Sequence, residues 1–424
     1  MLLHRDLRKI ISLGLKMLLA FLIPSFILLL GLLVHIVFIK AFTQRIHGNQ
    51  LKNSCYCPHE ERGMSLKIKK VHLSRRSAPL IKPFITALRS VTSIEYSAVH
   101  IELEDGTEGV GTASPTVVIT GDSTPSIEYA IQTIISPLLV GKEIDHLAAL
   151  SQAVQHSCVG NTSAKAAVEI ALFDAYAKKI KLPLYQVLGG KTNILQNDLT
   201  ISINQTDRMV QDAVDGIKQG FTALKIKVGL DGEKDYERIL AIREAVGEKI
   251  EIRVDANQGW TKKEAVRIIN NWQRDGLKIE IVEQPVAAND IDSLKYVTDR
   301  VQTPIMADES IFSPEQAIEL VYKRAVDWLN IKLMKAGGIV RAIQIADIAK
   351  AGGIPCMIGS MMESGTSVMA AAHIAAAHPN IKKIDLDAPL WLEESSTDSF
   401  PFKGPEIILS EKPGIGYDFL TSRK

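Results

Sequence analysis

The stretch TALKIKVG, residues 222–229, sets the expectation for the fold of this 424-residue chain. It reads as a buried β-strand, yet Lys225 and Lys227 stand two positions apart, and residues i and i+2 of a strand share one face. An edge strand could extend two such lysines into water. The sequence around the stretch decides whether this strand lies at a surface or inside a sheet.

Runs of this kind recur between residues 198 and 390, where amphipathic segments typical of helices separate them. In chain order they are LTISIN, TALKIKV, IEIRVDAN, KIEIVEQP, PIMADES, DWLNIKL, IPCMIGS and KKIDLDAP. Strands that alternate with helices at this spacing predict parallel βα units. Eight such units predict a closed (β/α)8 barrel.

A chemically functional residue stands at or near the end of most of these runs, and successive ones are 24 to 28 residues apart. They are Lys227, Asp255, Glu283, Asp308, Lys332, Ser360 and Asp385. The carboxyl ends of barrel strands surround one mouth. We therefore expect these side chains to converge on a single site.

Three of these residues, Asp255, Glu283 and Asp308, are acids from successive strands. Each acid taken alone could cap a helix or pair with a basic residue. Three carboxylates packed together repel one another unless a cation holds them, and ligand sets made only of oxygen favour Mg²⁺. The pattern therefore predicts one Mg²⁺ per site.

The positions of the lysines predict a site for proton transfer. Lys225 and Lys227 are expected to point into the mouth, where neighbouring ammonium groups depress each other's pKa and prepare a lysine to act as a general base. Lys332, four strands further on, is expected to face Lys227 across the mouth. Such a pair can reach opposite faces of one carbon, one lysine removing a proton and the other returning it. A Mg²⁺ on the adjacent carboxylate of the substrate would stabilise an enediolate.

The motifs KIK, VDAN, VEQP, ADES and IKLMKAGG resemble the enolase superfamily, and within it the muconate lactonizing enzyme subgroup. The resemblance covers residues 64–424 and implies an α+β capping domain that closes over the barrel mouth. It also implies that the three acids hold Mg²⁺ and that Lys227 and Lys332 form the acid/base pair. Lys225 would tune this chemistry and contact the substrate, and Asn257 would support the metal ligands.

Members of this subgroup that share the catalytic set include cycloisomerases, o-succinylbenzoate synthases, N-succinylamino acid racemases and dipeptide epimerases. In KIDLDAPL, Asp385 and Asp387 lie at i and i+2 and resemble the D-x-D element of the dipeptide epimerases, which implies that they bind the α-ammonium group of a dipeptide. Without that role, Asp385 would cap a helix and Asp387 would be solvated.

Two further segments, KPFITALRSV and SPTVVITGDS, are similar to the capping loops of epimerases that act on L-Ala-D/L-Glu. The resemblance implies that Arg89 meets the side-chain carboxylate of the substrate, which suits the fork of a guanidinium. It further implies that Thr200, Ser360, Met361 and Met362 line the substrate channel.

Three functions remain open on this basis. The first is Mg²⁺-dependent epimerisation of a dipeptide such as L-Ala-D/L-Glu by 1,1-proton transfer, with a place in murein peptide recycling. The second is a sister activity, that of an N-succinylamino acid racemase or an o-succinylbenzoate synthase. The third is a membrane-tethered binding protein without turnover.

The pattern also divides the chain. Residues 64–190 read as two strands followed by helices and predict the α+β capping domain, and residues 191–390 predict the barrel. Residues 391–424 are expected to return to the capping domain. Residues 1–63 form a hydrophobic extension of a different character.

That extension contains residues 17–39, which carry no Asp, Glu, Lys or Arg and as a helix would span roughly 34 Å, enough to cross a bilayer. Basic residues before it favour a single-pass inner-membrane anchor with its N-terminus inside. Alternatively, Met64 is the true start and the protein is cytoplasmic. Both interpretations are consistent with the sequence.

Composition limits the partners. The formal net charge of +1 and the lack of a basic cluster argue against nucleic acid. The expected partner is a small dipeptide, with membrane contact only through residues 17–39. We also expect a homo-oligomer.

Overall fold

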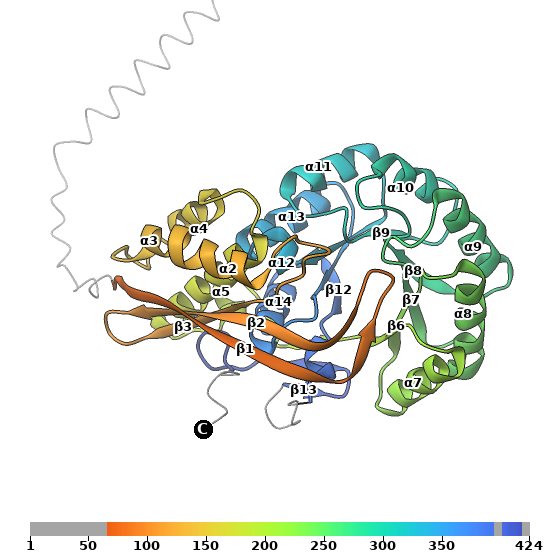
Figure 1. The fold of residues 1–424 in the computed structure, drawn as a ribbon, viewed down its shortest axis with the longest axis horizontal. Helices are drawn as coiled ribbons and strands as arrows, with labels where there is room; N and C mark the ends of the chain where they lie inside the picture. The colour runs from red at the N-terminus through yellow and green to blue at the C-terminus, as the bar shows by residue number, and fades with distance from the viewer. Residues whose placement is uncertain (1–65, 394–400, 418–424) are drawn as a thin grey trace, which may run out of the picture. The chain divides into compact units, whose positions relative to one another are not determined.

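The computed structural model describes residues 66–393 and 401–417 (Figure 1). The hydrophobic stretch at residues 17–39 and the alternative start at Met64 lie outside the described residues. No helix within the described ranges is long and apolar enough to span a bilayer.

Eight parallel strands form one sheet in the order β12-β11-β10-β9-β8-β7-β6-β5, and each overlaps one of the eight predicted runs. Their bounds are β5 (Leu199–Ile201), β6 (Ala223–Lys227), β7 (Glu251–Asp255), β8 (Ile279–Glu283), β9 (Ile305–Ala307), β10 (Trp328–Lys332), β11 (Cys356–Gly359) and β12 (Ile381–Asp385). A parallel bridge between Asn197 and Ile384 joins the two ends of the sheet. The predicted barrel is confirmed.

Helices follow the barrel strands, and Figure 1 shows α7 to α11 around the outside of β6 to β9. The helices are α7 (Thr206–Lys218), α8 (Gly232–Val246), α9 (Lys262–Arg274), α10 (Ile291–Thr298), α11 (Pro314–Lys323), α12 (Leu333–Ala336), α13 (Ile339–Ala351) and α14 (Gly365–Ala377). The side chains of Asp231, Thr261 and Ser313 cap α8, α9 and α11. Residues further along each loop therefore cap these helices, and the acids at the strand ends are free for other contacts.

Strand β6 shows how the barrel orients its lysines. It lies between β5 and β7, and all five of its residues are buried. Leu224 and Ile226 belong to the large hydrophobic core that includes residues of the surrounding helices, whereas Lys225 and Lys227 contact carboxylates inside the barrel. The alternative interpretation of β6 as an edge strand with solvated lysines is therefore wrong.

The N-terminal part combines an antiparallel sheet with helices. The sheet contains β1 (Ile68–Ile85), β2 (Ser90–Leu103) and β3 (Glu108–Ala113). The helical elements are α2 (Thr124–Tyr129), η1 (Ala130–Ile135), α3 (Ser136–Leu139), α4 (Leu147–His156), α5 (Thr162–Lys179) and α6 (Leu184–Val187). A Cβ on Gly111 would lie 2.0 Å from the carbonyl oxygen of Ala167. The glycine therefore permits close packing of β3 on α5.

The β1–β2 hairpin and the C-terminal segment both reach the barrel. Ile203 donates a backbone hydrogen bond to Ile85 at the end of β1. The 3-10 helix η2 (Ala388–Trp391) follows β12, and a further small sheet joins β13 (Phe402–Lys403), β14 (Glu406–Ile408) and β4 (Ile194–Gln196). The boundaries at residues 64–190, 191–390 and 391–424 stay predictions.

A buried carboxyl on α5 gives the fold a pH dependence. Glu169 is fully buried, and its Oε2 accepts a hydrogen bond from the Val340 amide at 3.0 Å. Burial raises the pKa of Glu169 to about 7. Between about pH 4.5 and pH 7 the unfolded chain loses this proton while the folded chain keeps it, so stability falls with rising pH across this window and then levels.

The Glu169→Gln variant is therefore expected to lack this fall and to be more stable than the wild type by about 3 kcal/mol at pH 8. Unfolding midpoints of both proteins, measured from pH 4 to 8, check this expectation. Two parallel curves would show that Glu169 stays ionised in the folded chain.

Candidate active site

A pocket at the carboxyl ends of the barrel strands collects most of the residues singled out in the sequence. Those that line it are Arg89, Thr200, Lys227, Asn257, Lys332, Ser360, Met361, Met362, Asp385 and Asp387. Four further predicted residues, Lys225 and the three acids, are almost completely buried beside it. Asp255 and Asp308 contact the lining lysines, and Lys225 contacts Asp385 and Glu283. The predicted convergence on one mouth is what the structure has.

Asp255, Glu283 and Asp308 bring carboxylate oxygens within 4.8 Å of one another. Burial and the negative charge of Asp255 raise the pKa of Glu283 to about 8. For Asp255, burial acts in the same direction, but the ammonium groups of Lys227 and Lys225 outweigh it and hold the pKa at about 2. Burial and Asp255 thus outweigh Lys225, whose ammonium group lies 2.8 Å from Glu283.

This donor set fits the Mg²⁺ that the fold implies. All three groups offer hard carboxylate oxygens, they come from adjacent strands, and they are buried at one point. A divalent cation would relieve the crowding of charge that raises the pKa of Glu283. Asp255, Glu283 and Asp308 are thus the residues that would hold the ion.

The two lysines at the pocket surface come from strands four apart in the eight-stranded barrel. Lys227, at the end of β6, pairs with Asp255 at 2.5 Å, and Lys332, at the end of β10, pairs with Asp308 at 2.8 Å. Each is therefore fixed by a carboxylate next to the proposed metal position. This arrangement places two ammonium groups on opposite sides of one pocket.

Lys225 differs from what the sequence predicts. Its ammonium group lies 3.1 Å from Asp255, 2.8 Å from Glu283 and 2.7 Å from Asp385. Burial alone would lower its pKa, but these carboxylates raise it well above the ordinary value. The expectation that Lys225 and Lys227 depress each other's pKa is therefore wrong for Lys225, because the acids outweigh the neighbouring ammonium group.

Asp385 and Asp387 lie in different electrostatic environments. Asp385 pairs with Lys225, and its pKa is lowered because that charge and those of Lys227 and Lys332 outweigh burial. Asp387 takes part in no ion pair between described residues, and burial together with Asp385 raises its pKa to about 6. Asp387 is buried, and its Oδ2 accepts a hydrogen bond from the Thr200 amide at 2.7 Å. The alternative prediction of a solvated Asp387 is therefore wrong. Of the two acids, Asp387 is the one without a cationic partner in the described part of the chain.

Arg89 approaches the pocket from the loop between β1 and β2. It lines the pocket with Phe84 and Thr86 of the same hairpin and with Ile119 of the loop after β3. Burial lowers the pKa of its guanidinium, and no ion pair in the described part of the chain involves it. A half-buried guanidinium without a partner carboxylate is suited to an anionic ligand.

The remaining predicted residues support the walls and floor. Asn257 has a positive φ of 41° and donates its backbone N–H to Oδ1 of Asp255 at 2.9 Å, which orients that carboxylate. The Ser360 amide donates to the Asp385 carbonyl, and the Met361 amide donates to Glu363. Met362 lines the pocket next to them.

Three residues around the acids were missed in the sequence. Lys335 pairs with Oδ1 of Asp308 at 2.5 Å, and Asn330 donates to Oε1 of Glu283 at 2.8 Å. Glu309 accepts from Asn257 at 3.1 Å, and burial, with the charges of Asp308 and Asp255, raises its pKa to about 7. Asn330 could have been found, because it lies two residues before Lys332 and shares its strand face. Nothing in the spacing pointed to Lys335 or Glu309.

A capped (β/α)8 barrel with three acids and two opposed lysines at its mouth defines a class of enzyme that moves protons next to a carboxylate. Family comparison agrees with that class. Residues 69–189 match the N-terminal domain of the mandelate racemase / muconate lactonizing enzyme family, and residues 208–422 match the enolase C-terminal domain-like family.

The chain is similar over most of its length to characterised relatives. It is 49% identical over 356 residues to the L-Ala-D/L-Glu epimerase of Bacillus subtilis, covering 83% of this chain and 96% of that protein. It is 42% identical to the hydrophobic dipeptide epimerase of Enterococcus faecalis, covering 83% and 99%. The N-succinyl-L-Arg/Lys racemase of Bacillus cereus is 33% identical, with coverage of 83% and 95%.

Structural comparison gives the same result. A substrate-liganded complex of the Bacillus subtilis L-Ala-D/L-Glu epimerase matches with a TM-score of 0.81, covering 82% of this chain and 98% of that chain. The Enterococcus faecalis dipeptide epimerase with Mg and L-Leu-L-Tyr matches with a TM-score of 0.79, covering 82% and 99%. The chain belongs to the mandelate racemase / muconate lactonizing enzyme family of the enolase superfamily.

Proposed function

We propose that this protein is a Mg²⁺-dependent dipeptide epimerase that inverts the Cα of the C-terminal residue of L-Ala-D/L-Glu or a similar dipeptide. The proposal is carried by the observation that Asp387, a buried acid with no ion pair among the described residues, lines the same pocket as two opposed lysines. Relatives named as dipeptide epimerases support it.

Each end of a dipeptide finds a complementary group. The α-ammonium group would meet Asp387, whose raised pKa an added cation would lower, and the side-chain carboxylate of a C-terminal glutamate would meet Arg89. The reacting Cα would then lie between Lys227 and Lys332. Phe84 and Ile119 are positioned to exclude water from the bound ligand.

Inversion needs two proton transfers at one carbon. In its neutral form one lysine would take the Cα proton, leaving an enediolate, and the other, as an ammonium, would deliver a proton to the opposite face. Mg²⁺ held by Asp255, Glu283 and Asp308 would supply positive charge to the substrate carboxylate. Lys225 would keep Asp385 and the metal ligands in place through its three ion pairs.

Proton NMR in D₂O tests the function. Full-length protein with Mg²⁺ is expected to remove the Cα proton signal of the C-terminal residue of L-Ala-L-Glu and to produce the L,D diastereomer. L-Ala-L-Leu and N-succinylphenylalanine complete the panel. Exchange confined to N-succinylphenylalanine would favour the sister racemase, and no exchange with any substrate would contradict the proposal and leave the synthase or a binding protein.

Arg89 is expected to determine the preference for glutamate. An Arg89→Met variant should raise the KM for L-Ala-L-Glu by about 10- to 100-fold, because a charge-assisted contact to a carboxylate is lost. Its kcat/KM with L-Ala-L-Leu should change little. Steady-state kinetics with both dipeptides measure this. An equal loss on both dipeptides would show that Arg89 stabilises the loop and does not recognise the glutamate side chain.

The biological setting is part of the proposal. Dipeptides that contain Ala and Glu fit recycling of murein peptides, and the protein would act as a homo-oligomer in the cytoplasm if translation starts at Met64. If residues 17–39 are present and inserted, it would be anchored in the inner membrane. N-terminal sequencing of the native protein distinguishes these two locations.

A further inference from the structure

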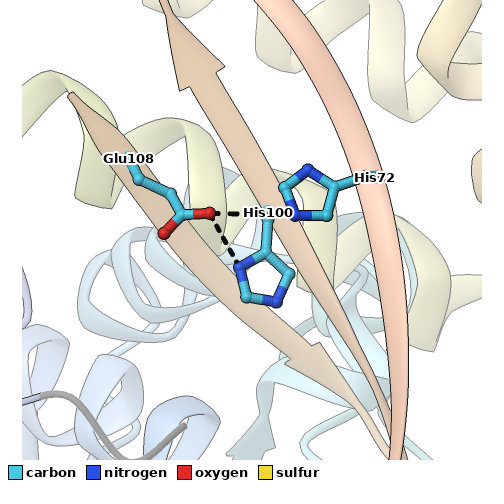
Figure 2. Close-up of side chains that lie close together, drawn as sticks. All are labelled: His72, His100 and Glu108. Atoms are coloured by element: carbon cyan, nitrogen blue, oxygen red, sulfur yellow. Dashed lines mark hydrogen bonds and ion pairs between the residues drawn. The ribbon is translucent and has the colours of Figure 1, made fainter. Parts of the chain in front are cut away.

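A second group of metal-ligating side chains lies on the N-terminal sheet, apart from the barrel mouth. His72 on β1 and His100 on β2 are directly paired in the antiparallel register, and Glu108 begins β3. Glu108 lies two residues from Val110, the β3 partner of His100, so its side chain shares the face of His100. Figure 2 shows the three side chains turned toward one another across the three strands.

The spacing of the three ligand atoms suits one small cation. Oε1 of Glu108 lies 3.0 Å from Nδ1 of His100 and 3.9 Å from Nε2 of His72 (Figure 2). One ligand atom from each residue lies within 4.8 Å of the other two. Ligands of a tetrahedral Zn²⁺ lie about 3.4 Å apart, which is close to this spacing. The two rings, 9° from parallel, would turn about their side-chain bonds to direct both nitrogens at one ion.

The contacts around the histidines favour metal binding. Nδ1–H of His100 donates to Oε1 of Glu108 at 3.0 Å, and Nε2 lies 3.2 Å from the Ser74 hydroxyl. With a metal on Nδ1, the ring would carry its proton on Nε2, where the Ser74 oxygen can accept it. The rings of His72 and His100 stack with centroids 4.6 Å apart.

The surroundings of the group leave room for an ion. The side chains of His72 and Glu108 are 38% and 46% exposed, so a metal has access from solvent. Two charged residues of the same sheet lie near His72: Glu102, which is negative and pairs with Lys69, and Lys70, which is positive. No ammonium or guanidinium group is within ion-pair distance of Glu108 among the described residues. The histidines are therefore the groups that face its carboxylate.

We propose that His72, His100 and Glu108 bind a divalent transition metal of the Zn²⁺ class, with a fourth position open to water. Nitrogen ligands distinguish this site from the all-oxygen set at the barrel mouth, which suits Mg²⁺. Bound metal would connect β1, β2 and β3 through their side chains. It would thereby stiffen the sheet whose hairpin carries Arg89.

Calorimetric titration of the full-length protein with Zn²⁺, in excess Mg²⁺, tests the proposal. The protein should carry Cys55→Ser and Cys57→Ser and no polyhistidine tag, so that neither this cysteine pair nor a tag binds zinc. The parent protein is expected to bind one more equivalent of Zn²⁺ than its His100→Gln or Glu108→Gln variants. Ser74→Ala is expected to weaken this equivalent about tenfold while keeping it.

The matched control is His146→Gln. His146 is exposed and lies 3.7 Å from Glu143, so it offers a histidine–glutamate pair without a third ligand. This variant should retain the full stoichiometry. Equal Zn²⁺ stoichiometry in the parent, His100→Gln and Glu108→Gln proteins would overturn the proposal. The three side chains would then form only a hydrogen-bonded group across the strands. Because Glu108 is exposed, Glu108→Gln serves as the test if His100→Gln does not fold.

Discussion

The Lys332→Met variant is expected to lose epimerisation of L-Ala-L-Glu by about 10³-fold or more, and Lys227→Met by a similar factor, because general acid–base groups contribute on this scale. Methionine preserves much of the length of the side chain but cannot carry a proton. Asp308, the partner of Lys332, keeps its ion pair with Lys335, so the variant retains a cation at this carboxylate.

The two variants are expected to differ in isotope exchange. With one lysine left, each should still exchange the Cα proton of one diastereomer with solvent deuterium while producing almost none of the other. The diastereomer should be the opposite one in the second variant. Proton NMR in D₂O with both diastereomers measures this. Exchange of the same diastereomer by both variants would contradict the assignment of opposite faces.

A surface lysine provides the control for these substitutions. Lys382 lies on β12, as part of the same barrel, but its side chain is exposed. A Lys382→Met variant is expected to epimerise at the rate of the wild type. A loss there comparable to that of Lys332→Met would point to a general effect of lysine replacement on the barrel.

The second large effect is expected for Asp387→Asn, with a loss of about 10²-fold in kcat/KM on dipeptides and little change on N-succinyl amino acids. A buried charge paired with an ammonium group contributes several kcal/mol to binding when its partner is truncated or neutralised. The amide fits the site, since its oxygen can accept from the Thr200 amide and its nitrogen can donate to the Thr200 hydroxyl.

Stability should not account for this loss. Because the pKa of Asp387 is raised to about 6, the ionised form costs free energy in the folded chain at neutral pH, and its removal is expected to stabilise the protein slightly there. Kinetics with L-Ala-L-Glu and N-succinylphenylalanine, together with unfolding midpoints, separate the two effects. Equal losses on both substrates would contradict an ammonium-binding role.

The barrel could be predicted because each strand repeats a local pattern. Apolar alternation defines the eight runs, and spacing alone brings Asp255, Glu283 and Asp308 to one mouth, since strand ends in a parallel barrel are equivalent. The face shared by Lys225 and Lys227 likewise follows from the two-residue period of a strand. These expectations need no knowledge of contacts distant in sequence.

The electrostatics of Lys225 could not be predicted in this way. Its pKa depends on Asp385, 160 residues away, which approaches only because the barrel closes between β12 and β5. Lys335 was missed for a related reason. It stands on the short helix α12, three residues after Lys332, and its pairing with Asp308 depends on the turn at the end of β10. The local sequence pattern shows which face of a strand a side chain occupies. Closure of the barrel determines which other side chains it contacts.

The pocket walls come from two separate sources, and this division bears on how new specificities arise. Phe84, Thr86 and Arg89 belong to the β1–β2 hairpin and Ile119 to the loop after β3, whereas every acid and lysine of the proposed chemistry belongs to the barrel. Substitutions in these segments can change which side chain is accepted while the proton-transfer groups stay intact. A library restricted to these four positions is therefore a rational starting point for directed evolution toward other dipeptides.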